Sequence, residues 1–142
     1  VVCYCDDCQE AGRRIEALPA ASRVLEPDGG TSLVVYRKDR LRCVRGEERL
    51  TRHKLKPESA TSRYVASCCN SALYLGFDDA KHWADVFTDR IEGPAPAVQM
   101  RLCTRYRPAG TDLPDDAAAY PGFPFALIAR FIRAKLAMTF GR

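Results

Sequence analysis

Three closely spaced cysteines at the start of the chain constrain its fold more than any other feature of the sequence. Cys3, Cys5 and Cys8 form a C-x-C-x-x-C cluster. Zinc binds thiolates at about 2.3 Å in a tetrahedral arrangement. A C-x-x-C turn lets two sulfurs face one ion, and the cysteine two residues earlier can reach that ion from an incoming strand. The spacing therefore predicts that these three cysteines bind zinc (Zn2+).

Three ligands leave one tetrahedral position of the zinc to be filled. A fourth side chain fills it in structural sites, whereas water or substrate fills it in catalytic sites. The vicinal pair Cys68-Cys69 offers a fourth ligand, although side chains of adjacent residues diverge on an extended backbone. Iron–sulfur ligation, a redox dithiol and plain buried thiols are the alternatives to zinc. Zinc is favoured over a redox dithiol, because such dithiols usually begin a helix in a βαβ unit, which the sequence does not predict.

The composition indicates one globular domain that spans residues 1–142. Val1-Val2 is typical of the end of a strand, which leaves open a further N-terminal segment before it. The net charge of +4 is too small to favour nucleic acid as a partner. No stretch approaches the roughly 20 apolar residues of a membrane-spanning helix. Seven cysteines, an odd number, favour metal binding over a full set of disulfides, and reduced thiols favour a cytoplasmic location.

The middle of the chain is predicted to be mainly β, because short apolar runs alternate with turn residues there. Asp78 is expected to cap a short helix. Cys43 and Cys103 have apolar, strand-like neighbours, so both are expected to be buried. The remaining expected elements are a short turn or one to two helical turns at 9–16, strands at 32–36, 41–44, 50–55 and 98–103, and a hairpin of 63–66 with 72–75 around Cys68-Cys69.

Residues 123–140 are predicted to form the clearest helix of the chain. Arg130 and Arg133 lie opposite its apolar stripe, so a basic amphipathic helix that touches a membrane surface or a partner is one interpretation. Packing across the sheet, or across a second subunit, is the favoured alternative. A homo-oligomer formed through this helix is therefore one expectation. The stripe consists of Leu127, Ile128, Phe131, Ile132, Leu136, Met138 and Phe140.

Two motifs together resemble the glutathione-dependent formaldehyde-activating enzyme (GFA) family. The first is Cys3-x-Cys5-x-x-Cys8-Gln9, and the second, after a β-rich stretch, is Arg63-Tyr64-Val65-Ala66-Ser67-Cys68-Cys69-Asn70-Ser71. Members of that family carry a C-H-C-x-x-C-[RQ] element and, after the sheet, an R-Y-F-C-x-x-C-G-S element. The resemblance covers most of residues 1–77. It implies a zinc-bearing β fold of the Mss4-like type, here followed by the C-terminal helix.

The resemblance also implies an activity and a set of metal ligands. The family joins glutathione to formaldehyde as S-hydroxymethylglutathione, which is a carbon–sulfur lyase reaction run in reverse, and it holds two zinc ions. The N-terminal cysteines match the triad of the proposed working site, with Tyr4 in place of the usual His, and Cys69 matches the last cysteine of the later pair. Ala66 and Asn70 replace the first cysteine and the glycine of that later motif, so the second zinc is expected to be missing. Cys69, or Cys68, is then available to complete the zinc of the triad.

The other candidate residues have simpler explanations. His53 and His82 are the only histidines, and either could act as a general base, but solvated or packed histidine is favoured. Asp6-Asp7 are expected to orient the C-x-x-C turn of the predicted zinc site by hydrogen bonds. The basic stretch from Arg37 to Arg45 could meet the carboxylates of glutathione, although a solvated hairpin face is favoured.

Two functions follow from these expectations. The first is a zinc-dependent, carbon–sulfur lyase-like protein that acts on an adduct of an aldehyde with glutathione or another small thiol. A zinc ion with three cysteine ligands and an open position would bind such a thiol as its thiolate. The second is a non-catalytic, zinc-stabilised β domain that serves as a binding module. A fourth protein ligand on the zinc would favour the second, because a closed ion could no longer bind substrate.

Overall fold

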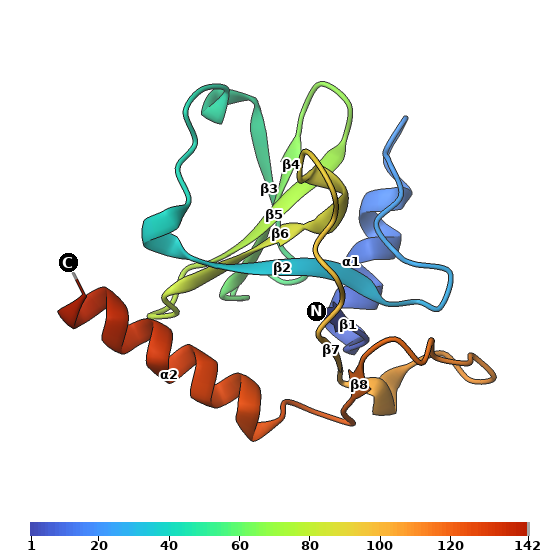
Figure 1. Ribbon diagram of the computed structural model, residues 1–142. Helices are drawn as coiled ribbons and strands as arrows, with labels where there is room; N and C mark the ends of the chain where they lie inside the picture. Colours follow the sequence, from blue (N-terminus) through green and yellow to red (C-terminus); the bar gives the residue numbers. More distant parts are fainter. Residues whose placement is uncertain (142) are drawn as a thin grey trace.

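The computed structural model describes residues 1–141, and this part of the chain is mainly β with a C-terminal helix, as predicted (Figure 1). Its strands form one mixed, eight-stranded sheet in the order β3-β4-β5-β6-β2-β1-β7-β8. The strands are β1 (Val2–Cys3), β2 (Thr31–Arg37), β3 (Leu50–His53), β4 (Thr61–Ala66), β5 (Ser71–Phe77), β6 (Trp83–Phe87), β7 (Met100–Leu102) and β8 (Ala118–Ala119). The α-helices are α1 (Asp6–Glu16) and α2 (Phe125–Phe140).

The sheet has a large antiparallel part and a smaller parallel edge. The antiparallel part contains β3, β4, β5, β6, β2 and β1, each paired with the next in this order. At the other edge β1 pairs parallel with β7, and β7 pairs parallel with β8. β1 joins the two parts, since Cys3 lies opposite Thr31 of β2 on one side and Leu102 of β7 on the other. The cysteine-bearing start of the chain therefore lies inside the sheet, beside a segment from the last third of the sequence (Figure 1).

α1 begins within the cysteine cluster and is longer than expected. It has 11 residues, whereas the sequence predicted one to two turns at 9–16. Asp6 and Asp7 occupy its first turn, where carboxylates interact favourably with the helix dipole. Ile15 joins the main core, and Gly12 lets Leu25 approach closely, because a Cβ at this position would lie 2.4 Å from Leu25 Cδ2. The helix therefore carries the C-x-x-C turn on a rigid element packed against the sheet.

Two predicted elements in the β region are wrong. Residues 41–44 are irregular rather than a strand, and Cys43 is exposed there instead of buried. No neighbouring strand is paired with this segment within residues 1–141. The helix predicted after Asp78 is replaced by strand β6, because the backbone of β6 pairs with both β2 and β5 in the centre of the sheet. Tertiary pairing overrides the local helical spacing at this point.

The other predicted elements are confirmed, some in shorter form. β4 and β5 make the expected hairpin around Cys68-Cys69, with Tyr64 opposite Tyr74. β2 covers the strand expected at 32–36, and β3 and β7 cover parts of those expected at 50–55 and 98–103. Cys103, which follows β7, is buried as predicted.

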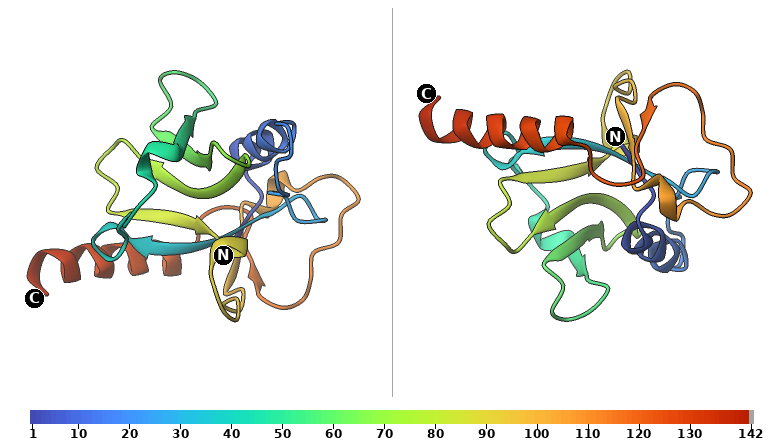
Figure 2. Two further views of the ribbon diagram at one scale, coloured as in Figure 1. Left: turned by 90° about the horizontal axis from the view of Figure 1, so that it is seen from above. Right: turned by 90° about the horizontal axis from the view of Figure 1, so that it is seen from below.

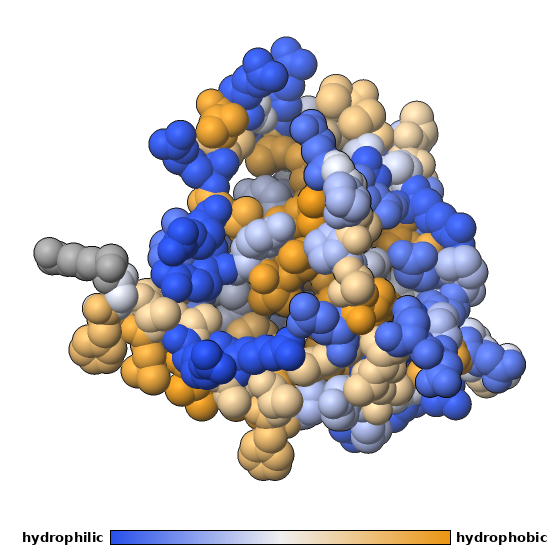
Figure 3. Space-filling model, in the orientation of Figure 1, coloured by the Kyte–Doolittle hydropathy of each residue, from blue (hydrophilic) through white to orange (hydrophobic). Residues whose placement is uncertain are grey.

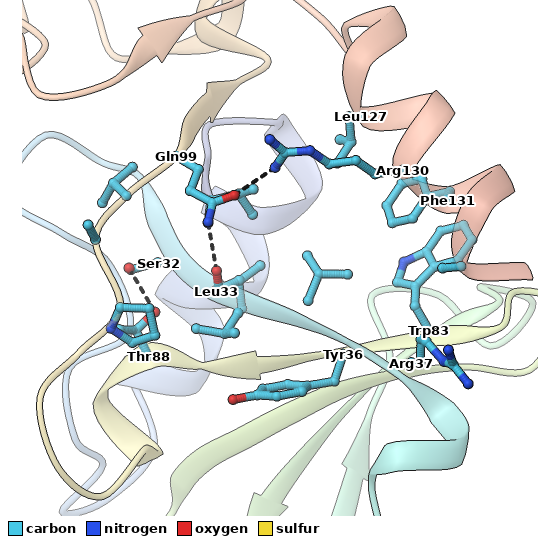
Figure 4. A pocket seen from close by; sticks show the side chains of 17 residues that line it. Ser32, Leu33, Tyr36, Arg37, Trp83, Thr88, Gln99, Leu127, Arg130 and Phe131 are labelled. Carbon is cyan, nitrogen blue, oxygen red and sulfur yellow. Dashed lines mark hydrogen bonds between the residues drawn. The ribbon is translucent and has the colours of Figure 1, made fainter. Parts of the chain in front are cut away.

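α2 packs on β2 and β6 through only part of its apolar stripe (Figures 1 and 2). Leu127 is buried, and the ring of Phe131 stacks on Trp83 with 4.0 Å between the centroids. Arg130 donates a hydrogen bond of 2.6 Å to Gln99, and a cavity of about 230 Å³ lies between the helix and β2 (Figure 4). The exposed members of the stripe are Ile128, Ile132, Leu136 and Phe140. Among the helices of residues 1–141, none is long and apolar enough to cross a membrane.

Candidate metal centre

The three N-terminal cysteines come together where β1 passes into α1. Cys3 ends β1, Cys5 is the N-cap residue of α1 with extended backbone, and Cys8 lies in the first helical turn. The three Sγ atoms lie within 4.8 Å of one another. Thiolates at this separation, on one strand end and one helix start, could hold a metal ion.

Hydrogen bonds fix the backbone of this turn. The amides of Cys8 and Gln9 both donate to the carbonyl oxygen of Cys5, at 3.0 and 3.1 Å. The side-chain amide of buried Gln9 donates to the carbonyl oxygens of Tyr4 and Tyr106, each at 2.7 Å. The residue that follows the cysteine motif therefore connects the C-x-x-C turn to the segment after β7.

Tyr4 lies between the first two cysteines in the sequence, and its side chain is fully buried. Its hydroxyl donates a hydrogen bond of 2.7 Å to Asp28 and accepts one from buried Arg101. Arg101 also pairs with Asp116 at 2.9 Å. Burial raises the pKa of Tyr4, and the hydrogen bond to Asp28 adds to this effect, so the phenol keeps its proton. The side chain is thus a positioning group that faces Asp28, and it holds the backbone between Cys3 and Cys5.

The charge balance of the cluster favours a thiolate at Cys5. Hydrogen bonds from Cys3 and Cys8 lower the pKa of Cys5 to about 3, and the positive charge of Arg63 contributes in the same direction. The same hydrogen bond with Cys5, together with burial, raises the pKa of Cys3. Arg63 is only 5 % exposed, and its guanidinium donates a hydrogen bond of 3.1 Å to the carbonyl oxygen of Asp7. A buried cation therefore acts on Cys5 and Cys8, two of the three groups that a metal would bind as anions.

The structure does not bring Cys69 to this cluster. Cys69 lies in the turn between β4 and β5, where it is exposed. Its Sγ is 3.7 Å from that of Cys68 and 3.3 Å from the Ser71 hydroxyl. Within residues 1–141, the group of mutually close metal-ligand atoms around the triad contains Cys3, Cys5 and Cys8 alone.

Cys103 is the neighbour of the triad that sequence reasoning missed. It is 4 % exposed and shares a core cluster with Cys3, against which Cys5 and Cys8 also pack. Burial raises the pKa of the Cys103 thiol, whereas a hydrogen bond with Cys3 lowers it. Its backbone is left-handed, with φ of 59°, directly after β7. No spacing in the sequence indicates this proximity, because it arises from the parallel pairing of β1 with β7.

The other candidate residues are held in packing or ion pairs. The His82 ring lies against Trp83, and its Nε2 is 2.8 Å from the carbonyl oxygen of Phe131. Asp78 pairs with Arg52 at 2.6 Å and with Lys54 at 2.7 Å rather than capping a helix. His53 ends β3. These residues lie on the antiparallel part of the sheet or beside α2, so the cysteine cluster is the strongest candidate site.

Comparison with known proteins assigns no family to the chain. No protein-family model matches it, and no curated protein matches it in sequence. The site itself combines three convergent thiols, a buried guanidinium and a fourth cysteine in the same core cluster.

Proposed function

We propose that the chain is an Mss4-like zinc protein, similar to the GFA family, that acts on an adduct of a small thiol with an aldehyde. The observation that carries the proposal is the group of three cysteine sulfurs within 4.8 Å, which supplies three of the four ligands of a tetrahedral zinc. Thiolates select zinc over magnesium or calcium, which prefer oxygen ligands. The cysteine donor set therefore fits zinc.

The residues of the site support thiol chemistry. Bound zinc would act as a Lewis acid that favours the thiolate form of an incoming thiol such as glutathione. Cys3, Cys5 and Cys8 would leave one ligand position for that thiol. Cys5 is partly accessible, so the site has a side open to solvent. Three thiolates and one zinc carry a net charge of −1, and the Arg63 guanidinium offsets it within the fold.

The reaction itself is an addition that needs no oxidant. The thiolate sulfur forms a bond to the aldehyde carbon, and the carbonyl oxygen becomes a hydroxyl by taking up a proton. The reverse step breaks the carbon–sulfur bond and returns thiol and aldehyde. The basic stretch from Arg37 to Arg45 is a weaker candidate for binding the carboxylates of glutathione, because Arg37 is already paired with Asp39.

A second function, a zinc-stabilised β domain that serves as a binding module, is favoured by one observation. Cys103 is buried and shares a core cluster with Cys3, against which Cys5 and Cys8 also pack, so a small shift of its thiol would make it the fourth ligand. A four-cysteine zinc would be closed to substrate. The two functions therefore differ in the identity of one ligand, which can be measured.

The experiment is zinc analysis and X-ray absorption at the zinc edge on purified protein, for the natural sequence, Cys103→Ser and the exposed control Cys43→Ser. Three sulfurs and one oxygen or nitrogen in all three proteins would support the open site. Four sulfurs that fall to three only in Cys103→Ser would overturn it in favour of the closed site. A protein without stoichiometric zinc would refute both functions.

Activity is tested next on the zinc-loaded protein. Glutathione and ¹³C-formaldehyde are mixed, and formation of S-hydroxymethylglutathione is followed by NMR exchange spectroscopy. We expect the natural protein to accelerate exchange and Cys5→Ser to return it to the uncatalysed rate, while Cys43→Ser keeps the full rate. Equal exchange with and without protein would reject glutathione as the thiol.

A further inference from the structure

The largest cavity described in the molecule is a groove on the antiparallel part of the sheet. It has a volume of about 680 Å³ and lies between the strands β4, β5 and β6 and the segment 38–50. Figure 1 shows this segment arching away from the sheet between β2 and β3, and Figure 3 shows the same side of the molecule hollowed. The groove is large enough to enclose a drug-sized ligand.

The groove lies on the opposite face of the sheet from α1. Val65, Leu75 and Phe87 pack with Ile15 of α1 in the main core. Side chains alternate between the two faces along a strand. The floor of the groove is accordingly made by the residues between or beside them, which are Tyr64, Ala66, Tyr74, Gly76, Ala84 and Val86.

The floor is flat and aromatic. The rings of Tyr64 and Tyr74 stack with 4.4 Å between centroids and planes 10° apart. Gly76 makes room for this arrangement, because a Cβ at its position would lie 2.8 Å from Tyr64 Cε2. Leu73 and Phe77 also line the groove, so the paired rings belong to a larger apolar surface suited to an aromatic or acyl body.

The charged side chains that line the groove are all basic, although Glu47 of the same segment lies close enough to act on Tyr74. The charged side chains that line the groove are Lys38, Arg42, Arg45, Arg49 and Arg90, with no acidic residue among them. Neither Arg42 nor Arg45 belongs to any ion pair of residues 1–141. Arg90 Nε is buried without a hydrogen-bond partner. These guanidinium groups have donors to spare for an anion.

The segment that carries Arg42 and Arg45 is attached at both of its ends. The Lys38 amide donates to the carbonyl oxygen of His82 at 2.9 Å, and Lys38 Nζ donates to the carbonyl oxygen of Phe77 at 3.0 Å. At the other end the carbonyl oxygen of Arg49 accepts the Ser67 amide at 2.8 Å. The basic residues therefore form a wall that faces the aromatic floor.

We propose that this groove binds a small amphipathic organic anion, an acyl or aromatic carboxylate whose apolar body lies on Tyr64 and Tyr74 and whose carboxylate meets Arg42 and Arg45. The basic rim disfavours a cationic ligand, and the apolar floor favours an anion with an apolar body over a purely polar one such as inorganic phosphate. The site is separate from the cysteine cluster and needs neither zinc nor the proposed activity.

The test compares two probes of similar size on the purified protein. Anilinonaphthalene sulfonate is an aromatic anion, and N-phenyl-1-naphthylamine is its neutral analogue; both fluoresce when bound to apolar surface. We expect Arg42→Glu/Arg45→Glu to weaken binding of the anion about tenfold, as expected for the loss of one or two charge-assisted hydrogen bonds, and to leave the neutral probe within about twofold. Oleate should displace the anion, whereas oleyl alcohol should not.

Matched controls locate the binding. Arg133→Glu/Lys135→Glu makes the same charge change on α2, away from the groove, and should leave both affinities unchanged. Cys5→Ser should also leave them unchanged, which separates this site from the metal centre. Oleate should shift the amide signals of Gly76 and Val86 in a two-dimensional NMR spectrum of the natural protein, a readout that needs no variant. Equal weakening by the two charge-reversed variants, or displacement of the anion by an oligonucleotide but not by oleate, would overturn the proposal.

Discussion

Arg63 Nη2 donates a hydrogen bond of 3.1 Å to the carbonyl oxygen of Asp7, and this contact joins β4 to the first turn of α1. It places a buried guanidinium between the two sequence motifs of the chain, the cysteine cluster and the hairpin that begins at Thr61. The hairpin thereby supports the C-x-x-C turn, although neither Cys68 nor Cys69 belongs to the cluster of Cys3, Cys5 and Cys8.

Replacing Arg63 should therefore weaken metal binding. Arg63→Met removes both the hydrogen bond and the charge that favours thiolates at Cys5 and Cys8. We expect about a tenfold loss of zinc affinity, which corresponds to about 1.4 kcal/mol, measured by competition with a chromogenic chelator. Arg63→Lys keeps the charge and should retain more affinity than Arg63→Met. Equal affinity in the natural protein and Arg63→Met would show that this charge does not act on the site.

Cysteine variants should separate the triad from the exposed pair. Cys5→Ser should lose stoichiometric zinc and, because bound metal stabilises only the folded state, should lower the melting temperature. Cys69→Ser should keep both the zinc and the melting temperature, since Cys69 is exposed in the β4–β5 turn. Elemental analysis and thermal unfolding with and without chelator measure both effects. Zinc loss in Cys69→Ser would instead support the family-based expectation that Cys69 is a ligand.

Tyr4→Phe tests the anchor between Cys3 and Cys5. The variant loses the hydrogen bond to Asp28 and leaves Arg101 without the phenol oxygen. Arg101 keeps its bond of 3.2 Å to Asp28, so what is lost is the phenol's hydrogen bonding to two charged groups. A hydrogen bond to a charged group contributes about 1.5–3 kcal/mol, so the free energy of unfolding should fall by about 2 kcal/mol in urea titrations. Tyr106→Phe is the matched control, because Tyr106 is 44 % exposed. The substitution also keeps the backbone carbonyl oxygen of residue 106, which accepts the hydrogen bond from Gln9. A loss of equal size in both variants would contradict the anchoring role.

Asp85 should make stability depend on pH. Its Oδ1 is buried without a hydrogen-bond partner among residues 1–141, and burial raises the pKa of this carboxyl to about 7. Below its ordinary pKa of about 4 the group is protonated in both the folded and the unfolded state, so its ionisation does not affect stability there. Between about pH 4 and 7 the unfolded chain ionises first, so the folded state loses stability as the pH rises.

Asp85→Asn should remove that loss. We expect the variant to be equal in stability to the natural protein near pH 4 and more stable by about 4 kcal/mol at pH 8, which is the free energy of moving this pKa from about 4 to about 7. Urea unfolding at both pH values measures the difference. Asp112→Asn, at an exposed position, is the control and should change stability at neither pH. A gain of the same size at pH 4 and pH 8 would mean that ionisation of Asp85 is not the cause.

The sequence by itself determined the features whose geometry is local. The C-x-C-x-x-C spacing spans six residues, so the approach of its three sulfurs follows from one strand end and one helical turn. The β4–β5 hairpin and helix α2 were predicted for the same reason, since alternation and helical periodicity act over neighbouring residues. The sequence also identified Cys103 as buried, but not what it is buried against.

Only the tertiary structure decided the relationships between distant segments. Parallel pairing of β1 with β7 brings Cys103 to Cys3, and the sheet position of β6 turns a helix-like stretch into a strand. The exposure of Cys43 and the separation of Cys69 from the triad were decided in the same way. All four features depend on which strands pair in the sheet. Strand pairing is determined by hydrogen bonding and burial between segments far apart in the sequence, not by the spacing of neighbouring residues.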